Sequence, residues 1–344
     1  MRELRTLPKA HLHLHLTGSA RRTTIRELAD RYGISLPPAL VNDDPDQGLH
    51  EGHRNWSDFQ SQYHAARQTI RSADDVRRII REAAEDDAAE GSGWLELQID
   101  PSSYEPYLGG LDPTVEMMVD ACQEAARTVG VGIGLVLAVS WAAPPQRAQR
   151  VARVAARYAD QGVVGFGISN DERLGEPDTF VLASRIARDA GLVVTPHAGF
   201  YSDHRHVRRC VELLGARRIG HGITAATNPT TLEILARNKV TMEVCPTSYA
   251  PFGVLSTLAQ VPIDAFKRAG VAVALGADDP LIFGTRLAGQ YEILRGVHGF
   301  DDQALSDLAR QAVRASTAPT EIVQRLLDGI DRWRGCASTA PRCR

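Results

Sequence analysis

Short apolar segments alternate with amphipathic helical segments along the chain, and this alternation constrains the fold more than any other feature. The segments with the apolar, β-branched character of buried strands are residues 10–16, 94–100, 131–139, 163–169, 191–198, 217–222, 240–246 and 271–279. Helical patterns lie between them, for example at residues 115–129, 145–160 and 178–191. Parallel strands need helical crossovers, so eight such repeats in 344 residues predict an α/β fold, a (β/α)8 TIM barrel.

Two regions do not fit the simple repeat. Residues 20–90 form a helical insertion after the first strand, and their polar part, residues 37–52, should be a loop. Residues 286–334 predict extra helices after the last strand. Because insertions after barrel strands commonly cover the mouth of the barrel, we expect residues 20–90 to cap the site. No composition break marks a second domain, so we predict one domain over residues 1–335 and a flexible tail over 336–344.

Charge, cysteine content and hydropathy narrow the classes of function. The net charge of −3 and the scattered arginines provide no basic patch for nucleic acid. Five cysteines without close pairing indicate free thiols in a reducing compartment. No signal-peptide run begins the chain, and no apolar run reaches the roughly 18 residues of a membrane span. We therefore expect a cytoplasmic protein with a small-molecule substrate and neither nucleic acid nor membrane as a partner; the oligomeric state is left open.

Histidines and aspartates stand at the carboxyl ends of the predicted strands. The stretch PKAHLHLHLTGS places His11, His13 and His15 on alternate positions, so all three should face one side of the first strand. Four further groups close other strands: His197, His221, Asp278 and Asp279. Barrel active sites are built at these ends, and three imidazoles with one carboxylate are typical of a zinc site. A hydrogen-bonded core would explain one such histidine, but the whole set favours a metal site.

The chain resembles the adenosine/AMP deaminase family of the amidohydrolase superfamily in seven motifs: PKAHLHLHLTGS, WLELQID, VVGFGISNDE, TPHAGF, RRIGHGI, MEVCPTSYAPFG and LGADDPLIFGTRL. The family's HxHxxG motif falls on His13, His15 and Gly18, whereas His11 stands where close relatives usually carry Glu. The resemblance implies one zinc ion per chain, held by His13, His15, His197 and Asp278. It also implies that His221 and Asp279 orient and deprotonate the attacking water. Imidazole and carboxylate ligands would accept another divalent metal as well.

The departures from the family pattern cluster around the expected substrate. The HAGF motif puts Phe200 where the family has a Glu that protonates the purine ring, and Phe has no proton to give. Thr17 stands where an acidic residue usually meets the ribose hydroxyl, and Asn170 where a Gly backbone usually approaches the purine. We expect the substrate to contact Thr17, Asn170, Phe200 and Asp279.

Other departures bear on the pocket and on a replacement proton donor. Gln98 replaces a common Arg and Tyr249 a common Asn, while Phe252 either lines the pocket or packs in the core. Asp171 and Glu172 keep the family's DE pair, to which we assign a structural role. The candidate replacement donors are Tyr201, Asp203, His204 and His11.

Together these features predict a zinc-dependent hydrolase of the adenosine deaminase type, which cleaves a C–N bond of a cyclic amidine. A zinc hydroxide would attack an aminated purine-like compound, such as a purine nucleoside, or another N-heterocycle, and ammonia would leave. A second type of zinc deaminase holds its metal with one His and two Cys, and its signature H-x-E…P-C-x-x-C is absent from this sequence. Two alternatives remain because the usual Glu is missing: a non-deaminating zinc hydrolase or ring-opening enzyme of a specialised biosynthetic pathway, and a catalytically silent binder of a nucleoside-like ligand.

Overall fold

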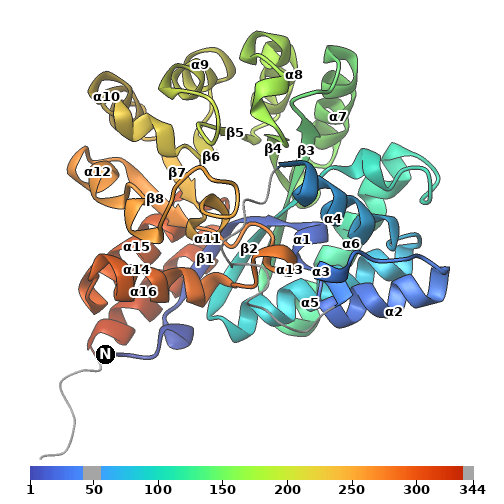
Figure 1. Cartoon of the computed structure of the whole chain (residues 1–344), viewed down its shortest axis with the longest axis horizontal. Helices are drawn as coiled ribbons and strands as arrows, with labels where there is room; N and C mark the ends of the chain where they lie inside the picture. The colour runs from blue at the N-terminus through green and yellow to red at the C-terminus, as the bar shows by residue number, and fades with distance from the viewer. Residues whose placement is uncertain (42–55, 336–344) are drawn as a thin grey trace, which may run out of the picture.

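Eight parallel strands form a barrel in sequence order in the computed structural model, which describes residues 1–41 and 56–335 (Figure 1). The strands are β1 (Lys9–His15), β2 (Ser92–Ile99), β3 (Gly132–Ser140), β4 (Val163–Ser169), β5 (Val193–Ala198), β6 (Arg218–His221), β7 (Thr241–Val244) and β8 (Ala272–Leu275). The predicted (β/α)8 barrel is confirmed, and each strand overlaps its predicted segment.

The last strand meets the first at a single short seam. Leu14 of β1 forms a parallel bridge with Asp278, which follows β8. Asp278 N donates to His13 O over 3.1 Å, and His15 N donates to Asp278 O over 3.1 Å. The seam that closes the barrel therefore runs through three of the residues that were predicted to bind metal.

Helices surround the barrel as an outer layer (Figure 1). Those that connect successive strands include α6 (Leu111–Val129), α7 (Pro145–Arg157), α8 (Val181–Asp189), α9 (His204–Leu214), α10 (Pro229–Arg237) and α12 (Ile263–Arg268). In α7 the buried side chains recur with helical spacing, at Ala148, Val151, Ala152 and Ala155. Such a one-sided apolar stripe must pack against the strands, and this packing fixes each helix on the outside of the barrel.

The insertion after β1 is helical, as predicted. It contains α1 (Leu16–Ser19), α2 (Arg22–Tyr32), α3 (Pro38–Val41), α4 (Trp56–Gln68) and α5 (Ala73–Ala89). The prediction of a loop over residues 37–52 is wrong at α3, where Pro38 begins a short helix because its fixed φ suits a first helical position. Residues 42–52 lie outside the described part of the chain.

Extra helices follow β8, which confirms that prediction: α13 (Pro280–Phe283), α14 (Leu287–His298), α15 (Asp302–Ala315) and α16 (Thr320–Gly335). One further short helix, α11 (Pro246–Tyr249), follows β7. Short 3₁₀ turns are η1 (Leu4–Thr6), η3 (Pro101–Ser103), η4 (Ala159–Gln161), η5 (Glu172–Leu174), η6 (Pro177–Phe180), η7 (Ile223–Thr227) and η8 (Leu258–Gln260). Within residues 1–41 and 56–335, no helix is long and apolar enough to cross a membrane. The predicted tail, residues 336–344, lies outside the described residues.

Candidate active site

The backbone is strained at three predicted site residues. Asn170, His221 and Asp278 have φ values of 68°, 65° and 60°, the left-handed region that non-glycine residues rarely adopt. His221 ends β6, and Asn170 and Asp278 follow shortly after the ends of β4 and β8. Strain of this kind persists only where the surrounding structure imposes it, and it is concentrated at functional sites.

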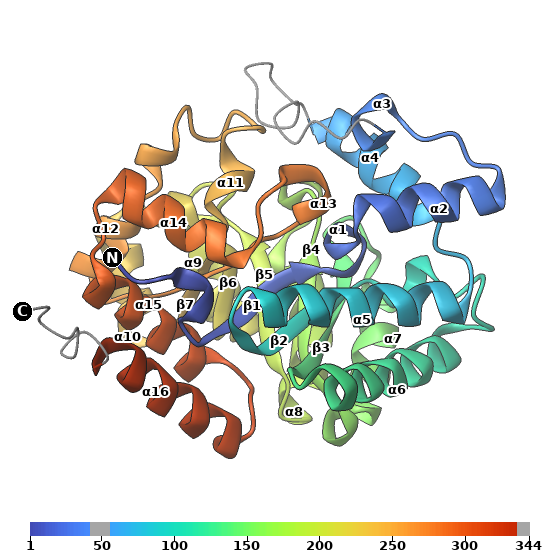
Figure 2. The same cartoon turned by 90° about the horizontal axis from the view of Figure 1, so that it is seen from below.

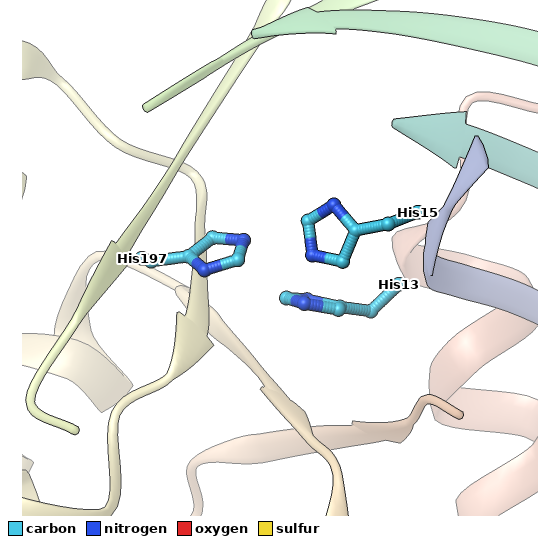
Figure 3. Close-up of side chains that lie close together, drawn as sticks. All are labelled: His13, His15 and His197. Carbon is cyan, nitrogen blue, oxygen red and sulfur yellow. The ribbon is translucent and has the colours of Figure 1, made fainter. Parts of the chain in front are cut away.

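Four histidines and two aspartates meet at the mouth of the barrel. The ligand atoms of His13, His15 and His197 lie within 4.8 Å of one another, and Figure 3 shows His197 facing the two β1 side chains from across the barrel. Two further groupings satisfy the same limit: His13 with His221 and Asp278, and His15 with Asp278 and Asp279. Asp278 Oδ1 lies 3.5 Å from His13 Nε2 and 3.3 Å from His15 Nε2.

Unused ligand atoms in this cluster suit a metal ion. His13 Nε2, His221 Nδ1 and Asp279 Oδ1 are buried, and none of them has a hydrogen-bond partner among the described residues. Leaving a polar atom buried without a partner costs free energy, so such atoms call for an explanation. Imidazole nitrogens and carboxylate oxygens are the donors that zinc and related divalent metals take. The residues present therefore fit a metal.

Two glycines make room for the cluster. A Cβ atom on Gly18 would lie 1.8 Å from Asp279 Oδ1, and one on Gly220 would lie 2.9 Å from both His13 Cε1 and His197 Cδ2. Neither contact is sterically possible without movement. A side chain at either position would therefore displace the groups that converge here.

His13 is held from behind by a chain of buried charges, which we name the Glu243–Arg218–Glu96 chain. His13 Nδ1 donates to Glu243 Oε2 over 2.9 Å, and Glu243 Oε1 lies 2.8 Å from Arg218 Nε. Arg218 Nη2 also pairs with Glu96. A carboxylate behind a metal-ligating histidine fixes its tautomer and ring orientation. The Glu243–Arg218–Glu96 chain could have been noticed in the sequence, because these three charged residues stand in predicted buried strands.

Burial and neighbouring charges shift the pKa values of these groups in different directions. Burial opposes protonation of His13, but the neighbouring carboxylates of Asp278 and Glu243 outweigh it and raise its pKa to about 10. Burial lowers the pKa of His221 to about 3, so this imidazole is neutral at pH 7. Burial, together with the negative charge of Asp278, raises the pKa of Asp279 well above its usual range. The two adjacent carboxyl groups are therefore unequal, since the pKa of Asp278 is lowered by its histidine neighbours.

His11 does not belong to the cluster, so the prediction that three histidines share one face is wrong for this residue. Its Nδ1 donates to Asp87 Oδ1 of α5 over 2.8 Å, and its Nε2 accepts from Ala277 N over 3.0 Å. The pairing of β1 with β2 shifts register between His11 and Leu14. One extra residue reverses the alternation of side chains, and the His11 ring meets Asp87 on α5, the helix that runs beside β2 in Figure 2. Both ring nitrogens are occupied, so His11 cannot donate a proton to a substrate.

A pocket of about 850 Å³, including space open to solvent, lies over the cluster and has two different walls. The polar wall contains Tyr63, Arg67, Gln98, Asp100, Ser103, Tyr104, Ser169 and Asn170. The aromatic wall contains Trp56, Phe59, Phe200, Tyr201, Phe252 and Phe283. The rings of the aromatic wall pack against one another around Phe252, whose centroid lies 5.1 Å from Phe59, 5.4 Å from Phe200 and 5.6 Å from Trp56. Phe252 thus lines the pocket.

Phe200 stands beside the cluster, with its ring centroid 4.7 Å from that of His221. Its backbone N donates to Glu172 Oε1 over 2.9 Å, and the backbone N atoms of Tyr201 and Ser202 donate to the same oxygen. Glu172 therefore shapes the loop that presents Phe200, in keeping with the structural role assigned to it. Tyr249 is fully buried behind Phe200 and accepts a hydrogen bond from Cys245 N, so it does not line the pocket.

The remaining substrate candidates differ in their access to the pocket. Asn170 lines it and accepts from Gln60 Nε2 over 3.2 Å. Thr17 is buried and does not line the pocket, but its hydroxyl lies 2.7 Å from the OH of Tyr104, which does. Gln98 Oε1 accepts from His197 Nε2 over 3.0 Å and links the polar wall to the cluster.

Of the three loop residues considered as replacement proton donors, the structure brings only Tyr201 to the pocket. The ring of Tyr201 lies under the Arg173 guanidinium, and burial raises its pKa to about 12. Asp203 caps α9 through Arg205 N, and His204 Nδ1 lies 3.0 Å from Thr231 Oγ1. Sequence reasoning missed the pocket residues of α4, which are Trp56, Phe59, Tyr63 and Arg67, because no local pattern shows where an inserted helix will pack.

Comparison with known proteins identifies what this architecture resembles. The adenosine deaminase family model matches residues 8–333. The chain is 50% identical over 332 residues to a Streptomyces virginiae protein named "Putative adenosine/adenine deaminase", a match that covers 96% of this chain and 98% of that protein. It is 34% identical to the aminodeoxyfutalosine deaminase of Streptomyces coelicolor, covering 95% of this chain and 84% of that protein.

Solved structures share the fold over nearly the whole chain. The adenine deaminase of Arthrobacter aurescens superposes with a TM-score of 0.85 at 25% identity, covering 95% of this chain and 99% of that one. An amidohydrolase from Burkholderia ambifaria with bound Zn also gives a TM-score of 0.85 at 25% identity, covering 97% of this chain and 93% of that one. A zinc ion is thus present in a protein of this architecture.

Proposed function

The chain belongs to the adenosine deaminase family of hydrolases, and from that premise we propose that it deaminates a purine-like heterocycle with one zinc ion per chain. The proposed ligands are His13, His15, His197 and Asp278. One observation carries the proposal: these four side chains converge in a buried cluster directly beneath a pocket, together with His221 and Asp279. A protein that merely bound a ligand would have no need of a proton-transfer pair at that point.

The proposed roles follow from the atoms that the cluster leaves free. Zinc in such a site supplies the Lewis acidity that makes water a nucleophile near neutral pH. Asp279 Oδ1 is buried without a hydrogen-bond partner among the described residues, so it can take the proton of the attacking water. His221 is neutral, with Nδ1 unpartnered, and can orient that water by a hydrogen bond.

The pocket walls support a flat heterocyclic substrate. The aromatic wall offers ring faces and edges for stacking, and the polar wall offers the Asn170 and Gln98 amides beside it. Named relatives act on adenosine, adenine or related compounds, so we propose an aminated purine as the first substrate class. In this arrangement Asn170, Phe200 and Asp279 contact the substrate, whereas Thr17 acts through Tyr104. The ring edge that faces Phe200 receives no proton from it.

The proposal also covers the domain bounds and the cellular location of the protein. We propose one domain over residues 1–335, since barrel, insertion and C-terminal helices share one buried core. A cytoplasmic location is supported by three free, buried cysteines, Cys122, Cys210 and Cys245, which are typical of a reducing compartment.

The test is ammonia release by metal-analysed protein from adenine, adenosine, AMP and N6-methyl-AMP, comparing the wild type with Phe200→Glu. We expect the zinc-loaded wild type to release ammonia from at least one compound. Phe200→Glu should raise the rate with adenine or adenosine by about 10²–10⁴, the usual contribution of a positioned general acid. Phe200→Gln is the matched control, because it is polar and of similar length but has no acidic proton.

Each contrary outcome points to a different function. Zinc-loaded protein that releases no ammonia from any of these compounds would overturn the proposal. Tight binding without turnover would then indicate the silent binder, and turnover of a substrate without an amino group would indicate the non-deaminating hydrolase.

A further inference from the structure

We propose that the amino-terminal end of the barrel, opposite the candidate active site, holds a second binding site, for a phosphate-type oxyanion. A cavity of about 1510 Å³, including space open to solvent, opens there. Its lining includes the first residues of four successive strands, which are Val193, Arg218, Thr241 and Ala272. The metal-binding candidates lie at the other ends of the strands, so the two cavities are separate.

The charged residues that line this cavity all have one sign. Its lining contains Arg188, Arg217, Arg218, Lys239 and Arg314, and no Asp or Glu is among the described lining residues. They come from the ends of α8, α10 and α15 and from the start of β6. Because the whole chain carries a net charge of −3, this collection of cations is a local feature. A concave surface lined by one sign of charge concentrates ions of the opposite sign.

Four of the five cations are free to bind. Arg188, Arg217, Lys239 and Arg314 are exposed, and none of them forms an ion pair within the described part of the chain. A neighbouring arginine of α15 shows the contrast, since Arg310 pairs with Asp331. Like charges gathered without partners repel one another, and a bound anion would relieve that repulsion.

The fifth cation gives the cavity a fixed floor. Arg218 is only 1% exposed, and its guanidinium is already engaged by Glu96, Glu243 and the carbonyl of Ala315, so it shapes the floor while the four exposed cations provide the anion ligands. The hydroxyls of Thr241 and Ser316 and the amide of Gln311 add neutral hydrogen-bonding groups to the same lining. Gln311 Oε1 accepts from Val273 N over 2.8 Å, which fixes the amide in place. Guanidinium groups with hydroxyl donors are the usual set for phosphate, because the planar arginine fork binds two oxygens at once.

The experiment is calorimetric titration of the metal-loaded protein with inorganic phosphate, comparing the wild type with the Arg217→Glu/Arg314→Glu double variant. We expect saturable binding with one phosphate per chain in the wild type, weakened roughly tenfold or more in the double variant, since each charged hydrogen bond contributes substantially. The control is Arg127→Glu/Arg325→Glu, which changes two exposed arginines of α6 and α16 and gives the same net charge. This control should bind phosphate like the wild type.

Three outcomes would overturn the proposal. They are the absence of saturable binding, binding that the Arg217→Glu/Arg314→Glu variant retains, and an equal loss in the control. Retained binding would place the phosphate on the metal, and an equal loss would reflect net charge alone. If circular dichroism shows that the double variant folds poorly, Arg188→Gln/Lys239→Gln tests the other two exposed cations of the cavity with a smaller change of charge. We expect this variant to weaken phosphate binding too. None of these results depends on the deaminase assay.

Discussion

The floor and the aromatic wall of the candidate active-site pocket are built in opposite ways. The floor consists of His13, His15, His197, Asp278 and Asp279, which stand at or just after the ends of barrel strands. The aromatic wall consists of side chains from the insertion and from loops, such as Trp56 and Phe252. The floor is held by charged hydrogen bonds inside the barrel, and the wall by ring contacts. The positions of the floor residues therefore depend on the fold, whereas the wall depends on segments outside the repeat.

This difference teaches where such a protein can change without losing its chemistry. The floor residues are packed so closely that only glycine fits beside them at positions 18 and 220. Replacing a floor residue therefore disturbs its neighbours. Replacing a residue of the wall alters only the shape and polarity that a ligand meets. The departures at Phe200 and Asn170 lie in the walls, while the proposed metal ligands are all present. We expect the chemistry to follow the floor and the choice of substrate to follow the walls.

The largest expected effect comes from the floor. Asp279→Asn keeps the shape of the side chain beside Gly18 but removes the group proposed to accept the proton of water, so kcat should fall by about 10²–10⁴. Steady-state kinetics measures the loss, and metal analysis should show that zinc content is unchanged. A variant that keeps its zinc and retains kcat within a few-fold would show that Asp279 is not the base.

A smaller effect is expected from the Glu243–Arg218–Glu96 chain, which contacts the proposed metal ligand His13 but not the metal. Glu243→Gln weakens the hydrogen bond that orients His13, and such changes typically reduce metal affinity by about 10–100-fold. Competition with a chelator measures the affinity, and kcat at saturating zinc should stay close to that of the wild type. The control is Glu90→Gln, a buried carboxylate that pairs with Arg5 and Ala288 N instead. Equal zinc affinities in these two variants would contradict the positioning role of Glu243.

The smallest effect is expected from the wall. Phe252→Ala removes the ring at the centre of the aromatic wall and should raise KM about tenfold through lost apolar contact, while kcat changes little. Phe300→Ala serves as the control, since Phe300 is a buried aromatic remote from the pocket lining. An unchanged KM for Phe252→Ala, or an equal rise of KM in both variants, would show that the aromatic wall does not contact the substrate.

The same division explains which features were predictable from the sequence. The strand ends that carry His13, His197 and Asp278 were found because alternation and apolar runs are local patterns that the barrel preserves. His11 was misplaced because a register shift between β1 and β2 depends on pairing with a distant segment. Glu243 was overlooked although a charge inside an apolar strand was visible.

The walls were harder to predict, since their residues meet only through tertiary packing. Whether Phe252 faces a pocket or the core depends on α4, a helix within the long insertion after β1. Thr17 does not line the pocket but contacts Tyr104, a lining residue from the loop after β2. No pattern within the chain's local sequence encodes either contact.

The seam between β8 and β1 also sets an order of events. The proposed ligands at one side of that seam belong to the first strand, and Asp278 follows the last, so the binding cage joins the two most distant parts of the barrel sequence. Contacts of such high contact order form late, after the intervening chain has folded. A nascent chain still on the ribosome would present the β1 histidines long before the carboxylate that completes the set is synthesised. Metal capture would then mark the end of folding, and a truncated chain lacking β8 would never assemble the complete cage.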